Sequence, residues 1–271
     1  MSGENQGGNM RVGTLWKASL VLGLLLMPVG AQAQATGDRS TQQQSIEQQN
    51  LQTTPAPQQY SITVAGQYTT RQGETAGAAP SLDLGYSVTA NLYLHLYQAY
   101  AFDRVTGAKT NFGPGDTEIG VRYRFIEPDD NGWRPGVVFY PLVDFPTGDV
   151  DKNLGTGRTH FFLPLWLGKQ LGLYTVYGGG GYWFNRGHGY KDWVYLDAGV
   201  QRRMTDDLRL GIDVFHDTSI RNGIKETTGI NIGGAYDVTA NHHILFSVGR
   251  GVQNVDETNK LSAYLAYQLT F

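Results

Sequence analysis

From residue 60 to the C-terminus, apolar and polar residues alternate in short segments that are separated by turn residues. The clearest segment is "GDTEIGVRYRFI", where Thr117, Ile119, Val121, Tyr123 and Phe125 occupy every second position. The charged residues of the segment all lie at the positions between them: Asp116, Glu118, Arg122 and Arg124. Successive side chains of a strand point to opposite faces, so this alternation predicts a β-strand with one apolar and one polar face.

About twelve such segments are expected, because the two-residue period returns after each turn signal. Their approximate ranges are 60–70, 81–88, 92–102, 115–126, 135–145, 159–168, 173–184, 192–203, 207–217, 227–238, 242–250 and 260–271. No stretch between them requires a helix, so the predicted fold class is all-β.

The connections between these segments alternate in length. Tight turns are expected at 89–91, 205–206 and 239–241, each after an even-numbered strand. Longer or glycine-rich loops are expected after the odd-numbered strands, at 71–80, 103–114, 146–158, 185–191, 218–226 and 251–259. Short periplasmic turns at one end and longer external loops at the other are typical of an antiparallel up-and-down outer-membrane β-barrel.

The N-terminal part has a different composition. Basic residues precede the apolar run 18–27, and "AQA" follows at 31–33, which is the order of a secretory signal peptide with cleavage after Ala33 or, as an alternative, after Ala35. Residues 1–33 are therefore predicted to be a signal peptide, with Met10 as an alternative start. Residues 34–59 are Gln-rich and lack a core, so we expect a disordered periplasmic segment before the barrel at 60–271.

A soluble lipocalin-like barrel or a sandwich would show the same alternation, with the apolar face as its core. The signal peptide, the asymmetry of the connections and the strand number together favour a membrane-spanning barrel. Unpaired backbone groups are costly in hydrocarbon, so a sheet in a membrane has to close on itself. The last segment, 260–271, is therefore expected to pair with the first, 60–70.

The composition excludes several classes of site. The sequence contains no cysteine, which leaves no disulfide, thiolate metal site or cysteine nucleophile. The formal net charge of -3 is too balanced to indicate a nucleic-acid partner. No motif implies a cofactor or a metal ion.

Four blocks of the sequence resemble a known family: "FGPGDTEIGVRYRF", "FPTGD", "LPLWLGKQLGLYTVYGGGGYWFN" and "DAGVQRRMTDDLRLG". They are similar to the outer-membrane proteins of the MetA pathway of phenol degradation family, a transporter family. The resemblance covers most of 81–271. It implies a bacterial outer-membrane barrel that passes small, aromatic or hydrophobic molecules, with membrane lipid and the barrel-assembly machinery as partners. It also implies that Tyr267, Leu269 and Phe271 form the C-terminal assembly signal.

The polar face of each strand would line the lumen, and its residues are the candidate solute path. By parity these are Asp83, His95, Glu118, Arg122, Arg124, Trp166, Tyr177, Trp183, Tyr195, Asp197, Arg209, Asp213 and Asp237. Flat rings can stack with an aromatic solute. The same rings can also simply fill the interior, since a barrel of about twelve strands lies between the filled and the open cases.

Two further features carry alternative interpretations. The four glycines 178–181 either open the wall or make room for rings of adjacent strands, and the second interpretation is favoured. His216 and Ser219 could belong to a lipid-modifying enzyme, but no orienting partner is evident. We therefore expect a non-enzymatic channel for small solutes, with a lipid-modifying barrel or a non-conducting structural barrel as the alternatives.

Overall fold

The structure is a computed structural model, and it describes residues 57–129, 131–185, 187 and 189–271. The predicted signal peptide and nearly all of the predicted Gln-rich segment lie outside the described residues. Among the described residues, no helix is long and apolar enough to cross a membrane.

The described chain consists of strands and one 3-10 turn, η1 (Val150–Lys152). The strands are β1 (Gln59–Arg71), β2 (Glu74–Ser87), β3 (Leu92–Val105), β4 (Asn111–Ile126), β5 (Gly136–Phe139), β6 (Leu142–Phe145), β7 (His160–Leu171), β8 (Tyr174–Phe184), β9 (Trp193–Arg203), β10 (Leu208–Asp217), β11 (Thr227–Asp237), β12 (His242–Gln253) and β13 (Leu261–Thr270). Most of these bounds lie within three residues of the ranges expected from the alternation, but β2 and β4 both start earlier than expected.

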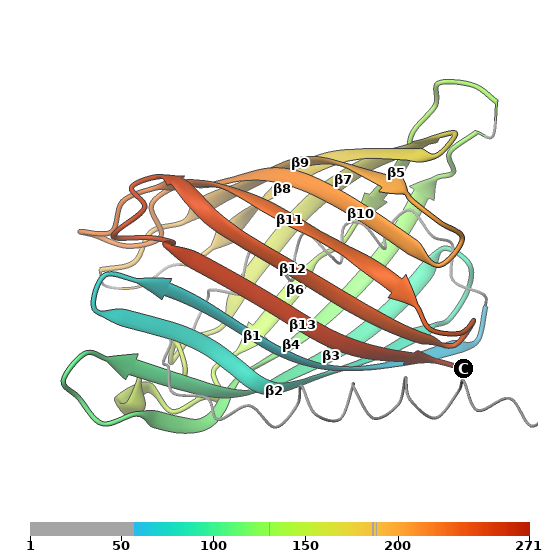
Figure 1. Cartoon of the computed structure of the whole chain (residues 1–271). Coiled ribbons are helices and arrows are strands. Elements are labelled where there is room, and N and C mark those ends of the chain that lie inside the picture. Colours follow the sequence, from blue (N-terminus) through green and yellow to red (C-terminus); the bar gives the residue numbers. More distant parts are fainter. Residues whose placement is uncertain (1–56, 130, 186, 188) are drawn as a thin grey trace, which may run out of the picture. The chain divides into compact units, whose positions relative to one another are not determined.

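The strands form one closed antiparallel barrel (Figure 1). Neighbours in sequence pair with each other, and β1 closes the ring on β13 with Ser61 opposite Thr270. The strands β5 and β6 both lie between β4 and β7 and make up a single crossing. They are separated at Tyr140 and Pro141, because a proline has no N–H to donate to the ladder. The barrel therefore has twelve crossings, as the sequence predicts.

The predicted loop at 71–80 is wrong. β1 continues to Arg71 and β2 starts at Glu74, so the connection is a two-residue turn with Gly73 at a φ of +73°. The start of β2 carries small residues, including the buried Ala76 and Ala78, so it shows little contrast between apolar and polar positions. Hydrophobic periodicity cannot detect a strand of this kind.

The burial of the side chains is inverted relative to a soluble protein. Ile119 and Ile212 point away from the barrel and are 45% and 44% exposed, whereas Glu118 points inward and is 3% exposed. An apolar outer face and a charged inner face exclude the soluble alternative, whose core would be apolar.

The two ends of the barrel differ. At the short-turn end, the connections are 88–91, 127–135, 172–173, 204–207 and 238–241. At the long-loop end, they are 72–73, 106–110, 146–159, 185–192, 218–226 and 254–260. Figure 1 shows the C-terminus at the short-turn end, and the β1–β2 hairpin at the opposite end.

Candidate functional site in the barrel interior

One side of the interior is covered by rings from β7 to β10, which we call the aromatic wall. It consists of Phe162, Trp166, Trp183, Trp193, Tyr195 and Phe215, and all six are buried. Phe162 stacks on Trp183 with centroids 4.6 Å apart, and Trp183 stacks on Trp193 at 5.4 Å. Tyr195 meets Phe162 and Trp166 edge-on at 6.4 Å and 6.1 Å. Stacked and edge-to-face ring contacts are favourable, so they hold the rings of the wall in fixed positions.

The four glycines of β8 make this packing fit. A Cβ on Gly179 would lie 2.5 Å from the Trp166 ring, and one on Gly181 would lie 2.6 Å from the Phe162 ring. Neither distance is compatible with a side chain. The inward glycines therefore leave space for rings of the neighbouring strand β7, which supports the favoured interpretation of 178–181.

The opposite side of the interior is lined by polar side chains of β1 to β4, which we call the polar wall. It consists of Gln67, Asp83, His95, Tyr97 and Glu118. Gln67 donates to the Tyr97 hydroxyl at 3.1 Å. The His95 ring lies between two carboxylates, 3.4 Å from Asp83 and 3.1 Å from Glu118. Buried charged groups are stable only when they are paired in this way.

Tyr140 joins the two walls. It lies at the interruption between β5 and β6, packs with the rings of the aromatic wall, and its hydroxyl is 3.0 Å from His95 Nδ1. Gly120 of β4 faces the same imidazole, and a Cβ there would lie 2.2 Å from His95 Nε2. The position of this histidine is thus fixed from both sides.

Further buried acidic groups lie on the strands of the aromatic wall, closer to the short-turn end. Asp197 accepts a hydrogen bond from the Tyr195 hydroxyl at 2.8 Å, and Asp213 accepts from Asn231 at 2.7 Å. Tyr177 is buried beside Gly199, where a Cβ would lie 2.4 Å from the tyrosine hydroxyl. Carboxylates therefore occur on both sides of the interior.

The inward arginines lie at the short-turn end, where they belong to separate groups. Arg122 covers the Tyr93 ring at 4.7 Å, and Arg124 is 3.4 Å from Glu127. Arg209 is 2.9 Å from Asp237. The sequence placed all of these residues in one lumen-facing set, and the structure distributes them around the rim of the barrel.

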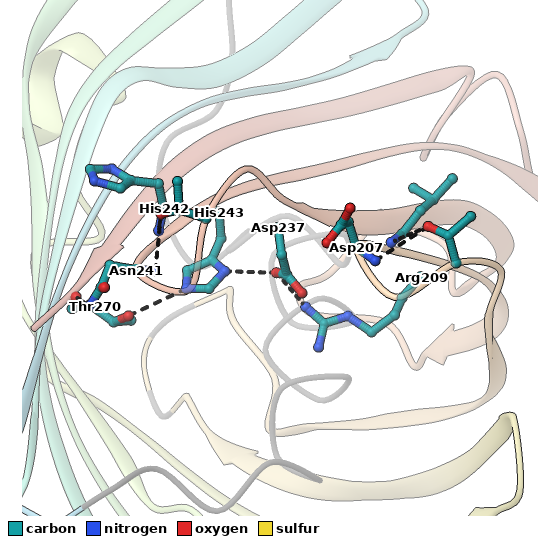
Figure 2. Close-up of polar contacts among 10 residues, drawn as sticks. Asp207, Arg209, Asp237, Asn241, His242, His243 and Thr270 are labelled. Atoms are coloured by element: carbon teal, nitrogen blue, oxygen red, sulfur yellow. Dashed lines mark hydrogen bonds and ion pairs between the residues drawn. The ribbon is translucent and has the colours of Figure 1, made fainter. Parts of the chain in front are cut away.

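Figure 2 shows a chain of polar contacts at this rim that the sequence did not predict. Asp237 contacts both Arg209 and His243, with His243 Nδ1 at 2.7 Å. His243 Nε2 in turn lies 3.3 Å from the Thr270 hydroxyl. The chain links β10, β11, β12 and β13, and His242 points outward to the Tyr267 hydroxyl instead. Adjacent histidines in a strand face opposite sides, so the pair cannot act as one unit.

The loop 146–158 is held against the inner side of β4 by Asp116. This carboxylate accepts hydrogen bonds from Gly148 N at 2.9 Å, Thr156 N at 2.8 Å and the Thr156 hydroxyl at 2.7 Å. Leu154 of the loop is completely buried, and a Cβ on Gly113 would lie 3.1 Å from it. The Asp of the GPGD block thus accepts a hydrogen bond from the backbone N–H of the Gly in the PTGD block.

A charge pair orders the same loop on its outer side. Asp149 caps η1 by accepting from Lys152 N at 3.2 Å, and its carboxylate also pairs with the Lys152 ammonium. This hydrogen bond to the ammonium holds the pKa of Asp149 below its usual value.

The residues considered for hydrolysis do not form a catalytic pair. His216 Nδ1 contacts the Thr228 hydroxyl at 2.9 Å. The Ser219 hydroxyl donates to the carbonyl oxygens of Arg221 and Ile224, at 2.9 Å and 2.6 Å. In the described part of the chain no hydrogen bond joins His216 to Ser219, so a nucleophile–base arrangement is absent there. Among all the described residues, no group of three or more His, Cys, Asp or Glu side chains could hold a metal ion.

The residues expected to form the assembly signal lie on the last strand and beyond it. Phe271 stacks on Tyr60 with centroids 5.7 Å apart, and Tyr60 stacks on Tyr86 at 4.6 Å. Leu269 lies opposite Ile62 of β1. The role of Tyr267, Leu269 and Phe271 in assembly stays a prediction.

Several solved structures share the fold. An outer membrane channel from Pseudomonas putida F1 is 18% identical, with a TM-score of 0.63, and the match covers 80% of this chain and 96% of that chain. The KdgM porin is 11% identical, with a TM-score of 0.53, and covers 77% of this chain and 99% of its own. The NanC porin is 11% identical, with a TM-score of 0.50 and coverages of 78% and 98%. The comparison with curated proteins gave no match.

These low sequence identities show a shared fold only, whereas a family model identifies the family. It matches residues 38–268, which is most of the chain. The protein belongs to the family described as "Putative MetA-pathway of phenol degradation".

Proposed function

We propose that this protein is an outer-membrane channel through which small solutes with an aromatic or hydrophobic part diffuse. The observation that carries the proposal is the interior of the barrel, where the stacked aromatic wall faces the polar wall. Flat rings offer stacking and apolar contact to a flat solute. The opposite side chains offer hydrogen bonds to its polar groups, so one solute can satisfy both walls.

One donor on the aromatic wall supports this path. Trp183 Nε1 is buried, and among the described residues it has no hydrogen-bond acceptor. A buried polar group without a partner costs free energy, unless a bound molecule supplies the missing atom. A hydroxyl oxygen of a passing solute would provide that acceptor.

The outer face supports a place in a lipid bilayer. Exposed aromatic residues lie towards the short-turn end of the strands: Tyr60, Tyr123, Phe125 and Tyr174. A second set lies towards the long-loop end: Tyr100, Phe112, Phe145, Phe161 and Tyr182. Exposed aliphatic residues lie between the two sets: Leu82, Leu94, Leu96, Ile119, Leu163 and Leu165. Two aromatic girdles around an apolar band are the surface of an outer-membrane barrel, with lipid as its partner and the short turns in the periplasm.

Uptake into liposomes tests the proposal. The full chain is reconstituted, and the entry rates of phenol, of benzoate and of a hydrophilic sugar of similar size are compared with those of protein-free liposomes. We expect the protein to accelerate phenol most strongly, and Trp183→Ala to change the rate for phenol more than for the sugar. Trp133→Ala is the matched control, because Trp133 is 87% exposed on the connection 127–135. Rates equal to those of protein-free liposomes for every solute would instead indicate a structural barrel.

A further inference from the structure

A pocket opens at the long-loop end of the barrel, between β1, β10, β11 and two of the loops. It is lined by Phe215 at the end of β10, by Ile220 and Ile224 of the loop 218–226, and by Thr258 and Asn259 of the loop 254–260. None of these residues was singled out in the sequence. The loops that form it lie at the end of the barrel opposite the C-terminus (Figure 1).

The apolar side of the pocket continues the aromatic wall. Phe215 is a member of that wall and is almost completely buried. Ile220 packs against the same cluster of rings. A molecule in the pocket would therefore contact the end of the aromatic wall. An aromatic ring that binds there removes apolar surface from water, which is favourable.

The polar side contains a buried acceptor that has no donor among the described residues. Asn259 is 4% exposed, and its Nδ2 donates to the Ser262 hydroxyl at 3.0 Å. Its Oδ1 is buried and has no hydrogen-bond partner among the described residues. Buried side-chain oxygens are normally paired, so this oxygen is available to accept a hydrogen bond from a molecule in the pocket.

The pocket is lined by two carboxylates, Asp217 and Glu257, and by two cationic side chains that are both paired. Arg71 forms a bidentate pair with Glu74, at 2.9 Å and 2.7 Å. Lys225 lies 2.9 Å from Glu257. These are the cationic residues that line the pocket, and each is already engaged by a carboxylate. The pocket therefore does not favour an anion such as a carboxylate, and a neutral molecule fits it better.

Hydrogen bonds within the loops fix the shape of the pocket. The Ser219 hydroxyl donates to the Ile224 carbonyl at 2.6 Å, which closes the turn of the first loop. The Thr258 hydroxyl donates to the Thr227 hydroxyl at 2.9 Å, which ties the second loop to β11. A preformed pocket binds with a smaller loss of conformational entropy than loops that must be ordered first.

We propose that this pocket is a capture site for a neutral aromatic alcohol. The ring lies against Phe215 and Ile220, and the hydroxyl donates to Asn259 Oδ1. The inference rests on the proposed function, since it names the solute class and the place where that solute first binds.

Equilibrium binding to the full chain tests the inference. The chain is purified into lipid nanodiscs, and radiolabelled phenol, toluene and benzoate are titrated, with empty nanodiscs subtracted. We expect saturable binding of phenol, about tenfold weaker binding of toluene, which lacks the donor, and no saturable binding of benzoate. Equal affinities for phenol and toluene, or a preference for benzoate, would overturn the proposal.

A substitution of the acceptor gives the sharper test. Asn259→Ala is expected to weaken the binding of phenol about tenfold and to leave the binding of toluene unchanged. Asn91→Ala is the matched control, because it removes a carboxamide from a turn at the opposite end of the barrel. Folding of each variant is checked by its shift in an unheated gel. Should Asn259→Ala fail to fold, Ile224→Lys replaces it, and loss of both phenol and toluene binding is then expected. Unchanged phenol binding in the folded variant contradicts the site.

The same preparations separate this inference from the proposed function. Liposome uptake of phenol without a saturable binding site means that the channel exists and the capture site does not. Absence of both uptake and binding rejects the function itself.

Discussion

The aromatic wall and the polar wall of the interior arise from the same alternation of strands but are stabilised differently. On the aromatic wall, rings such as Trp166 and Phe162 lie over inward glycines of the next strand, and their contacts are apolar. On the polar wall, side chains such as His95 and Glu118 are held by charge pairs and hydrogen bonds. The outer faces of both walls carry exposed apolar side chains. The outer face is apolar on every side of the barrel, so we expect the difference between solutes to be made inside.

The two walls should therefore respond differently to substitution. Loss of a ring removes packing and leaves a cavity, whereas loss of a charge leaves its buried partner uncompensated. The predictions below use this difference, in order of decreasing expected effect.

The largest effect is expected at the centre of the aromatic wall. Trp183→Ala removes the ring that lies between Phe162 and Trp193, and it should lower the free energy of unfolding by about 3 kcal/mol. Urea unfolding in detergent, followed by the gel shift of the folded barrel, measures the change. The matched substitution Trp133→Ala affects an exposed ring and should change stability by less than about 0.5 kcal/mol. Equal losses at the two positions would mean that the wall is not packed as described.

A smaller effect is expected on the polar wall. Glu118→Gln removes the charge that faces His95 at 3.1 Å, and it should lower the free energy of unfolding by about 2 kcal/mol. The conductance of the reconstituted protein for cations should fall at the same time, because a carboxylate in a narrow lumen attracts them.

Glu127→Gln is the control for this position. Glu127 is largely exposed and lies 3.4 Å from Arg124, so its loss should cost less than about 0.5 kcal/mol. A loss of phenol uptake in Glu118→Gln that equals the loss in Trp183→Ala would remove the distinction between the walls.

Loss of the hydrogen bonds between Asp116 of β4 and the loop 146–158 should destabilise that loop without unfolding the barrel. Asp116→Asn weakens the hydrogen bonds that hold Gly148 and Thr156, so the loop 146–158 should open about tenfold more often. Limited trypsin cleavage after Lys152 reports the opening. Asp151→Asn is the control, because Asp151 is an exposed residue of the same loop. Cleavage rates that are the same in both variants would show that Asp116 does not hold the loop.

The sequence predicted the strands well because the outer face of the barrel is apolar and much of the inner face is polar, which produces a two-residue period along each strand. It could not predict the contacts of Asp116, whose donors include backbone N–H groups 32 and 40 positions away. A backbone donor leaves no signal in the residue type. The β1–β2 hairpin was missed for a different reason. Small residues such as Ala76 give too little contrast in hydrophobicity between the two faces of the strand.

The interior was predicted as a set of residues but not as an arrangement. Parity identified Phe162, Trp166, Trp183 and Tyr195 as inward, and the structure brings the four rings together. Parity does not give the register between strands, so the separation into an aromatic and a polar wall could not be derived. Asn259 was missed because it lies in a loop, where no period applies.

The smallest effect is expected at the connection 127–135, which belongs to neither wall and joins β4 to β5 at the short-turn end. Lys169 of β7 pairs with Asp129 of this connection at 2.5 Å, and that hydrogen bond lowers the pKa of Asp129. A lowered pKa means that the tether is present above the ordinary Asp value of about 3.9, and is lost as the pH falls through the lower value in the folded protein.

A spin label can follow this release. The chain has no cysteine, so Asn131→Cys provides one labelling site on the connection. The label should be restricted at pH 7 and become mobile only when the pH falls well below the ordinary Asp value of about 3.9, while Asp129→Asn should make it mobile at every pH. A label at Lys109→Cys, in a loop at the other end, should not change over this range. If the label at position 131 stays restricted in Asp129→Asn, backbone contacts and not the ion pair hold the connection against the barrel.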